Sequence, residues 1–339
     1  MITASTPGRL MLAPMEGLVD VILRDLLTRM GGVDTCVTEF IRVTDTLLPN
    51  RTYYRMCPEL LQGARTAAGV PVWVQLLGSD PEALARNARR AAKLGAPVID
   101  LNFGCPAKTV NRHCGGAALL VDPERIHRIV AAVRAAVPPQ IPVTAKMRLG
   151  LQDRSLMFDN ASAIESAGAS LLTIHARTKV EGYRPPAYWE EIARIGERVQ
   201  IPLVANGEVW TLEDYDRCRQ QSGCVDVMLG RGLVSQPWLA LQIRARQQGL
   251  PIPEPSLALL SPWLLAFWSR CLNHLSFNFA LGRSKQWLKM LCRGVPALQA
   301  ELAELQRETC PMGFGQRLLQ LSDSEAARQY QVDLQPSAA

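Results

Sequence analysis

The chain has 339 residues, of which 48% are hydrophobic and 20% charged, and its net charge is +6. This composition is typical of a globular protein with a sizeable core, and it excludes a disordered chain. No apolar run approaches the roughly 20 residues of a membrane helix. The segment Met1–Arg9 lacks the pattern of a secretory signal, so a cytoplasmic protein without a membrane partner is expected.

The nine cysteines form no C-x-x-C pair and are irregularly spaced. This pattern disfavours zinc ribbons and iron–sulfur sites, so no metal is expected. An odd number of cysteines in a chain of this size indicates free thiols in a reducing compartment.

Eight short apolar runs, each rich in Val, Ile or Leu, recur within the first 230 residues. The runs are Leu10–Met15, Cys36–Phe40, Val72–Gly78, Val98–Cys105, Val143–Leu149, Leu171–His175, Leu203–Gly207 and Val225–Gly230. Runs of this kind are typical of strands that are buried on both faces of a parallel sheet.

Helical patterns with clear start and stop signals separate most of these runs. They cover Pro81–Leu94, Asp122–Val137, Asp159–Ala167 and Thr211–Ser222. Asp122 and Thr211 are N-cap residues, and Gly95 and Gly168 follow helix ends. Eight strand–helix units of this length predict an α/β fold, namely a (β/α)₈ TIM barrel, rather than a doubly wound sheet.

The chain changes character after residue 249. Residues 250–256 form a Pro-rich linker, and a wholly helical pattern follows. The expected helices are Pro262–Ser276, Arg283–Arg293, Val295–Glu308 and Gly315–Leu321. We therefore expect a barrel at 1–249, a linker at 250–256, a helical domain at 257–325 and a tail at 326–339.

The positive charge is concentrated in the helical part. Between Arg244 and Arg317 there are nine Arg or Lys residues and four Glu residues. Lys285, Lys289 and Arg293 are spaced to lie on one helix face. That stripe alone fits a solvated helix face equally well, but the excess over the whole domain favours a polyanion such as RNA.

Two glycine-containing turns follow the last two predicted strands. Asn206-Gly207-Glu208 follows the seventh strand, and Gly230-Arg231-Gly232 follows the eighth. In TIM barrels the active site lies at the carboxyl ends of the strands, and phosphate often binds at this corner. Each turn alone would be read as an ordinary turn, but the pair favours a phosphate site.

Lys146 and His175 end the fifth and sixth predicted strands. A Lys at the barrel mouth needs an anionic partner, and beside a flavin it would stabilise the anionic reduced ring. The alternative is a structural salt bridge to Glu16 or Asp100. His175 would contact the ring or the phosphate, or would be a hydrogen-bonded barrel residue.

Cys105 lies in a Gly-Cys-Pro turn at the end of the fourth predicted strand. A thiol with an ordinary pKa of about 8.5 is protonated near neutrality and suits a general acid. The alternative is a small buried apolar residue. Cys114, in a nearby His-Cys-Gly-Gly loop, is a second candidate thiol or an incidental one.

Read in order, these motifs resemble those of the tRNA-dihydrouridine synthases. The matching stretches are Leu12–Gly17, Val74–Gly78, Asp100–Pro106, Lys146–Gly150, His175–Thr178, Ala205–Glu208 and Gly230–Gly232. The resemblance implies an FMN-binding barrel followed by a helical RNA-binding domain. Further stretches, namely Thr38–Val43, Thr178–Tyr183 and Arg283–Leu288, are similar to the bacterial C-type subfamily, which modifies position 16 of tRNA.

The resemblance assigns roles residue by residue. The implied FMN-binding residues are Pro14, Met15, Glu16, Gln75, Lys146, His175, Asn206, Gly207, Glu208, Gly230 and Arg231. The implied tRNA contacts are Arg42, Asn102, Tyr183, Arg283 and Lys285, with Asn102 next to the target base. NADPH would reduce FMN, the flavin would deliver hydride to C6 of a uridine in the D-loop, and Cys105 would protonate C5.

Two other functions remain open from the sequence. A flavin barrel that acts on a free pyrimidine, as dihydroorotate dehydrogenases do, would share the phosphate corner without needing a basic helical domain. A tRNA-binding chaperone would bind RNA without turning over a cofactor. A monomer is the default expectation for the assembly, and the sequence does not distinguish NADPH from NADH.

Overall fold

The computed structural model describes residues 7–111 and 115–323 of the chain. These residues form two compact units. The first unit comprises residues 7–21, 33–111 and 115–230, and the second comprises residues 22–32 and 231–323. Each unit is described by itself below.

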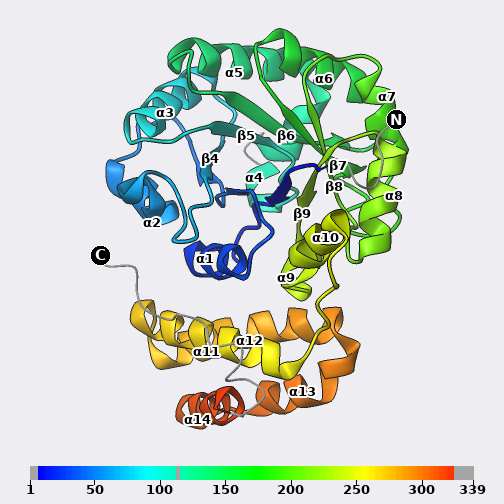
Figure 1. The fold of residues 1–339 in the computed structure, drawn as a ribbon. Coiled ribbons are helices and arrows are strands. Elements are labelled where there is room, and N and C mark those ends of the chain that lie inside the picture. Colours follow the sequence, from blue (N-terminus) through cyan, green and yellow to red (C-terminus); the bar gives the residue numbers. More distant parts are fainter. Residues whose placement is uncertain (1–6, 112–114, 324–339) are drawn as a thin grey trace. The chain divides into compact units, whose positions relative to one another are not determined.

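The first unit is a closed barrel of eight parallel strands (Figure 1). Its strands are β1 (Leu10–Leu12), β2 (Thr35–Val37), β4 (Val72–Leu77), β5 (Ile99–Phe103), β6 (Val143–Gly150), β7 (Leu172–Thr178), β8 (Leu203–Asn206) and β9 (Asp226–Leu229). β1 pairs with both β2 and β9, and β2 pairs with β4, so the ring of strands has no open edge. The predicted (β/α)₈ barrel and the positions of all eight strands are confirmed.

A short additional strand, β3 (Ile41–Arg42), follows β2 and also pairs with β4. Cys36 pairs with Val72, whereas Ile41 pairs with Leu76. The pairing therefore shifts by one residue between β2 and β3. The strand that was expected over Cys36–Phe40 therefore ends early, at Val37, and β3 begins beyond the predicted range.

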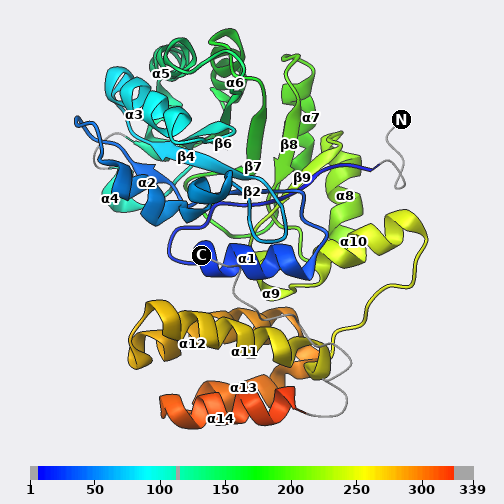
Figure 2. The ribbon, with the colours of Figure 1, turned by 60° about the vertical axis from the view of Figure 1, so that its left-hand side comes forward.

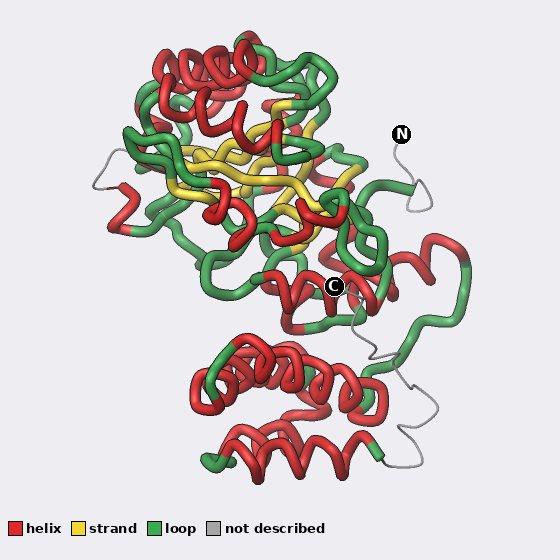
Figure 3. Tube along the Cα trace, turned by 90° about the vertical axis from the view of Figure 1, so that its left-hand side faces the viewer, coloured by secondary structure: helices red, strands yellow, loops and turns green. Residues whose placement is uncertain are grey.

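Helices alternate with the strands and cover the outside of the barrel, as Figure 3 shows by its red and yellow segments. They are α2 (Asn50–Met56), η1 (Pro58–Gln62), α3 (Pro81–Lys93), α5 (Pro123–Ala136), α6 (Met157–Ser166), α7 (Trp189–Gly196) and α8 (Leu212–Ser222). Two short helices, α4 (Lys108–Asn111) and η2 (Gly116–Val121), belong instead to the segment after β5. Asp80, Asp122 and Thr211 cap α3, α5 and α8 through their side-chain oxygens, as N-cap residues do.

The inside of the barrel changes from apolar to polar along the strands. One cluster of buried apolar side chains comprises Met11, Ala13, Val37, Trp73, Val98, Leu171, Val204 and Met228. Towards the carboxyl ends of the strands, polar residues occupy every second position, as in Thr144, Lys146 and Arg148 of β6. Because side chains of a strand alternate between its two faces, these three share one face.

The second unit is helical (Figure 2). It contains most of α1 (Val21–Met30), together with α9 (Arg231–Ser235), α10 (Leu239–Gln248), α11 (Leu257–His274), α12 (Phe277–Gly294), η3 (Pro296–Leu298), α13 (Gln299–Arg307) and α14 (Pro311–Ser322). Among the helices of the described ranges, none is long and apolar enough to cross a membrane.

Aromatic side chains form the core of this unit. Phe267 and Trp287 meet edge to face with ring centroids 4.8 Å apart, and Trp268 meets Phe314 at 5.1 Å. Contacts of this geometry stabilise a core beyond the area they bury. The indole nitrogen of Trp287 donates to Val234 O at 3.0 Å, which ties α12 to α9.

Three helices of this unit begin earlier than the sequence indicated, whereas the helix expected over Val295–Glu308 is shorter: α13 covers Gln299–Arg307, and the short helix η3 precedes it. α11 begins at Leu257 instead of Pro262, because Ser256 caps it by accepting from Leu259 N at 3.1 Å. α12 begins six residues earlier than predicted, at Phe277. The domain boundary that the sequence predicted at residue 249 stays a prediction. The expected tail at 326–339, and Cys114 with its loop, lie outside the described residues.

Candidate active site

The predicted barrel residues lie at the carboxyl ends of the strands, where the strand register brings several of them together. Asn102 of β5 pairs with Lys146 of β6, and His175 of β7 pairs with Asn206 of β8. Gln75 of β4 pairs with Asp100 of β5. The sequence motifs are therefore neighbours in space because the sheet is parallel and closed.

A buried hydrogen-bond chain joins β4, β5 and β6. Gln75 Nε2 donates to Asp100 Oδ2 at 2.6 Å, and Thr144 Oγ1 donates to Asp100 Oδ1 at 2.6 Å. Asn102 Nδ2 donates to Gln75 Oε1 at 2.7 Å. All four side chains are at most 9% exposed, so each depends on these partners for its hydrogen bonds.

The turn that carries Cys105 is held from several sides. Asn102 Oδ1 accepts from the backbone N–H groups of Gly104 and Cys105, both at 2.9 Å. The carbonyl of Cys105 accepts from Asn111 Nδ2 at 2.9 Å and from Ala117 N at 3.1 Å. The backbone N–H and C=O of Cys105 thus both form hydrogen bonds within the protein, which fixes the backbone position from which the thiol side chain extends.

The Cys105 side chain is 9% exposed and packs with Leu77 and Val110. Burial raises the pKa of the Cys105 thiol above its ordinary value, and the charge of Glu16 adds to this rise. A backbone hydrogen bond at Ala107 and the charge of Arg148 act in the opposite direction. The thiol therefore keeps its proton at neutral pH, as a proton donor must.

The side chain of Lys146 is partly buried, and its hydrogen-bond partner is neutral. Its Nζ donates to Asn206 Oδ1 at 2.8 Å, and Asn206 Nδ2 in turn donates to Met228 O at 2.8 Å. Burial lowers the pKa of Lys146 to about 7; the nearby charge of Arg148 lowers it further, and that of Asp100 opposes the change. Among the described residues no carboxylate is bonded to Nζ, so an anionic ligand would favour its charged form.

Gly207 supplies the space that His175 needs. Its φ of 116° lies in a region that side chains disfavour, and a Cβ at this position would lie 2.7 Å from His175 Cδ2. Gly207 O accepts from Trp189 Nε1 at 2.9 Å. The turn after β8 is therefore shaped by the histidine ring on one side and by α7 on the other.

Glu208 follows in the same turn, and protein donors occupy its carboxylate. One oxygen accepts from the guanidinium of Arg177, and the other accepts from Trp210 Nε1 at 3.1 Å. Arg177 is fully buried, so it needs this anion. Glu208 would consequently offer a ligand its backbone rather than its carboxylate.

The remaining predicted cofactor residues flank the turns after β1 and β9. Pro14, Met15 and Glu16 follow β1, and Met15 O accepts from the N–H of Leu18 at 3.0 Å. Glu16 is exposed. Gly230 follows β9, and Arg231 is the first residue of α9.

The residues predicted to contact tRNA are at least partly accessible, apart from Asn102. Arg42 of β3 is exposed, and Tyr183 in the segment after β7 is 52% exposed. Arg283 and Lys285 of α12 are partly exposed. Trp287 of the same helix is fully buried and belongs to the core.

Sequence reasoning gave no role to Arg148, although the structure places it between two loops. Its Nε donates to Gly104 O at 2.9 Å, beside Cys105. Its Nη1 donates to Thr178 O at 3.1 Å and to Gly182 O at 2.9 Å, and its guanidinium lies 5.3 Å from the ring centre of Tyr183. The side chain of Arg148 thus bonds both to the turn that carries Cys105 and to the segment after β7 that carries Tyr183.

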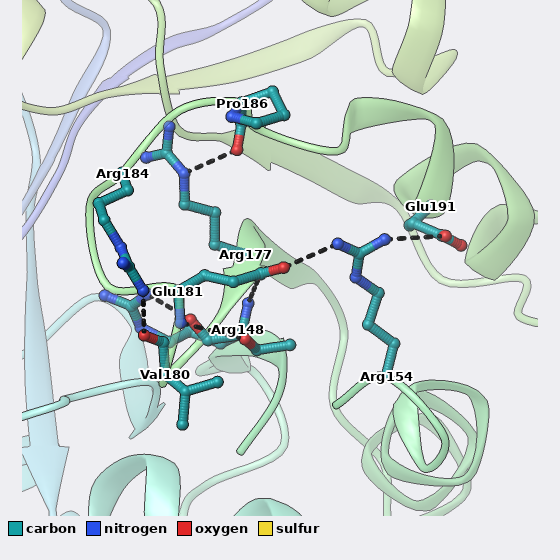
Figure 4. Close-up of polar contacts among 9 residues, drawn as sticks. Arg148, Arg154, Arg177, Val180, Glu181, Arg184, Pro186 and Glu191 are labelled. Atoms are coloured by element: carbon teal, nitrogen blue, oxygen red, sulfur yellow. Dashed lines mark hydrogen bonds and ion pairs between the residues drawn. The ribbon is translucent and has the colours of Figure 1, made fainter. Parts of the chain in front are cut away.

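The Tyr183 segment is fastened by further charged contacts, which Figure 4 shows. Glu181 accepts from Thr178 N at 2.6 Å and from Arg154 at 2.8 Å. Arg177 Nε donates to Pro186 O at 3.0 Å. The alternation of polar residues along β6 and β7 was the available signal for Arg148 and Arg177, because residues two apart share the inner face.

Comparisons of the whole sequence with a family model and with individual known proteins point to the same family. A model described as Dihydrouridine synthase (Dus) matches residues 11–317. The tRNA-dihydrouridine(16) synthase of Aquipseudomonas alcaligenes is 59% identical over 88% of this chain and 94% of that protein. The proteins of the same name from Pseudomonas putida (58%; 88% and 92% covered) and Shewanella oneidensis (48%; 88% and 93% covered) are also similar.

Solved structures share the fold at low sequence identity. A 2-naphthoyl-CoA reductase complex aligns with a TM-score of 0.54 at 13% identity, over 72% of this chain and 50% of that chain. A variant of NCR from Zymomonas mobilis aligns with a TM-score of 0.50 at 13% identity, over 74% and 89%. These likenesses bear on the barrel fold alone.

Proposed function

Because the chain belongs to the dihydrouridine synthase family, we propose that it reduces a uridine of tRNA to 5,6-dihydrouridine in a flavin-dependent reaction. The target we propose is position 16, since the similar proteins are named for that position. The observation that carries the proposal is the protonated, backbone-held thiol of Cys105 at the mouth of a barrel that also presents Lys146.

The donor set of the mouth fits FMN. Lys146 Nζ is bonded to a neutral amide and would gain an anionic partner from the ligand, and His175 presents a polar ring. Gln75 is fully buried and its amide is bonded to Asp100 and Asn102, so we propose that it borders the ring system. Gly207 provides a turn in which a Cβ would collide with His175. We propose that these residues bind FMN together with Pro14, Met15, Glu16, Asn206, Glu208, Gly230 and Arg231.

When bound and reduced by NADPH, FMN supplies a hydride for C6 of the uracil ring. Cys105 then donates the proton that C5 requires, and its raised pKa ensures that this proton is present at neutral pH. Asn102 lies next to Cys105 in the chain of hydrogen bonds, and one N–H of its amide has no partner among the described residues. That N–H is suited to a carbonyl of the base.

The target base must leave the stacked RNA to reach a thiol that is 9% exposed. We propose that Tyr183 and Arg42 contact the RNA near the mouth and that Arg283 and Lys285 contact phosphates. The excess of basic residues in the C-terminal helices supports this assignment. A cytoplasmic monomer that meets tRNA and NADPH in solution is part of the same proposal.

The test is nucleoside mass spectrometry on unmodified tRNA after incubation with the protein, FMN and NADPH. A gain of two hydrogens on one uridine establishes the reaction, and fragment analysis gives the position. A flavin-loaded, reducible protein that modifies no tRNA would disprove the proposal and favour a free pyrimidine as substrate. Replacing NADPH by NADH in parallel reactions tests the reductant.

A further inference from the structure

Asp100 is a buried carboxylate that the proposed chemistry does not use. It is 2% exposed, and it accepts from Gln75 and Thr144, each at 2.6 Å. Burial raises the pKa of Asp100, and both of these hydrogen bonds oppose that rise. A charged group in such a place is costly, so its presence calls for a role.

The hydrogen bonds that start at Asp100 reach the backbone of Cys105 in three steps. Gln75 Nε2 donates to Asp100, and Gln75 Oε1 accepts from Asn102 Nδ2 at 2.7 Å. Asn102 Oδ1 then accepts from the N–H groups of Gly104 and Cys105. Every link in this chain is between 2.6 and 2.9 Å long.

An amide side chain can turn over and exchange its donor and acceptor ends, whereas a carboxylate can only accept. The carboxylate of Asp100 therefore obliges Gln75 to present its NH₂ group to Asp100 and its oxygen to Asn102. Asn102 must then present its NH₂ group to Gln75 and its oxygen to the Cys105 turn. With either amide reversed, two donors or two acceptors would face each other.

We propose that Asp100 is a positioning residue for Cys105, which it orients through Gln75 and Asn102. This inference rests on the proposed function, because it gives Asp100 its role through the proton donor. Thr144 binds the other carboxylate oxygen and stands outside the route to Cys105. Within the described part of the chain Asp100 makes no hydrogen bond to the Cys105 thiol, so its effect passes through the two amides.

The first test measures Cys105 without cofactor or RNA. The apoprotein is alkylated with iodoacetamide at several pH values, and the Cys105 peptide is quantified by mass spectrometry. Wild-type Cys105 reacts slowly, because its thiol is buried and protonated. In Asp100→Ala the turn is released, and we expect Cys105 to react about tenfold faster near pH 8. Asp100→Asn, which can still accept from Gln75, gives a smaller increase.

The second test separates the two half-reactions of the loaded enzyme. Reduction of bound FMN by NADPH should change less than threefold in Asp100→Asn, whereas dihydrouridine formation by the reduced enzyme should slow roughly tenfold to hundredfold. A small displacement of a reacting group is sufficient for such a loss. An equal slowing of both half-reactions would contradict a role exerted through Cys105.

Tyr53→Phe is the matched control for the loss of a buried hydrogen bond. The Tyr53 hydroxyl is fully buried and donates to Asn87 Oδ1 at 2.6 Å, away from β5 and the Cys105 turn. This variant should lower the melting temperature without changing the alkylation rate of Cys105. A role of Asp100 in stability alone predicts the same result for Asp100→Asn.

A double variant tests the chain of hydrogen bonds from Asp100 to Cys105. In Gln75→Glu combined with Asp100→Asn, the carboxylate moves one position along the chain, and every hydrogen bond can form again. The slow alkylation of Cys105 should return in this apoprotein, whereas Gln75→Glu alone brings two carboxylates together and should accelerate it. Fast alkylation in the double variant, or wild-type alkylation in Asp100→Ala, would overturn the proposal. Absence of dihydrouridine with the wild-type protein would instead refute the proposed function and leave the alkylation result standing.

Discussion

In the barrel mouth, Gln75, Asp100 and Asn102 are at most 9% exposed and are joined by hydrogen bonds of 2.6–2.7 Å. On α12, Lys289 and Arg293 are exposed, and their charges act through water. A buried group has one set of partners and one geometry, whereas an exposed charge can be replaced by its neighbours. Substitutions in the mouth should therefore have large, specific effects, and those on α12 small, additive and salt-dependent ones.

The largest effect is expected for Cys105→Ala. Loss of the proton donor should slow dihydrouridine formation roughly 10²–10⁴-fold, as is usual for general acids. The measurement is a single turnover of reduced enzyme with unmodified tRNA, followed by nucleoside mass spectrometry. Cys310→Ala is the control, because this exposed thiol lies in the helical unit and should be silent. Unchanged turnover in Cys105→Ala would remove the thiol from the mechanism.

Gly207→Ala should weaken FMN binding roughly 5- to 150-fold. The added methyl group meets His175 at 2.7 Å and the backbone φ is 116°, which together cost about 1–3 kcal/mol. Fluorescence titration of FMN with apoprotein measures the change. Gly223→Ala shares a positive φ of 68° but has nothing within 4 Å, so it should leave FMN affinity intact. Equal losses of FMN affinity in the two variants would show that backbone strain, and not the contact with His175, causes the loss.

Because of the titration of Lys146, the free energy of unfolding of the apoprotein should rise between pH 7 and pH 9. The folded pKa of Lys146, about 7, is below its unfolded value of 10.5, so the unfolded chain binds more protons in this window. The free energy of unfolding then rises by at most about 1.4 kcal/mol per pH unit. Above pH 9 the raised pKa values of thiols such as Cys105 and Cys224 act in the opposite direction. Urea unfolding should show the slope in the wild type and its absence in Lys146→Met.

The smallest effects are expected for Arg283→Ala and Lys285→Ala. Each should raise the KM for tRNA a few-fold and reduce the salt dependence of binding by about one unit of log–log slope. Arg128→Ala, an exposed arginine of α5, is the charge-matched control and should change neither quantity. A loss of turnover at saturating tRNA would show that α12 does more than attract the phosphate backbone.

The sequence allowed the barrel to be predicted because its strands are nearly continuous apolar runs. Helix starts were predicted well where an Asp or Thr cap preceded Pro or acidic residues, as at Asp122 and Thr211. They were predicted poorly at α11, where Pro262 suggested a start and Ser256 was assigned to the linker. Pro262 is accommodated inside this helix, so the competing cap at Ser256 decided the boundary.

The sequence indicated where polar residues meet at the strand ends, but not which of them contact one another. Motifs at strand ends indicated Cys105, Lys146 and Asn206, yet the partner of Lys146 is Asn206 and not Glu16 or Asp100. Which side chains meet depends on the register between strands that are up to 60 residues apart in the chain. Local patterns carry no information on that register, so Asp100 was considered only as a salt-bridge partner of Lys146, whereas it accepts hydrogen bonds from Gln75 and Thr144.

The burial of Cys105 also bears on how the enzyme would withstand peroxide. Oxidation to sulfenic acid proceeds through the thiolate, and a buried thiol with a raised pKa forms little of it. Cys310 is the exposed cysteine among the described residues and should be oxidised first. The burial that, in the proposed mechanism, keeps the thiol protonated for C5 thus protects the same sulfur from oxidation, and dihydrouridine formation should persist after Cys310 is oxidised.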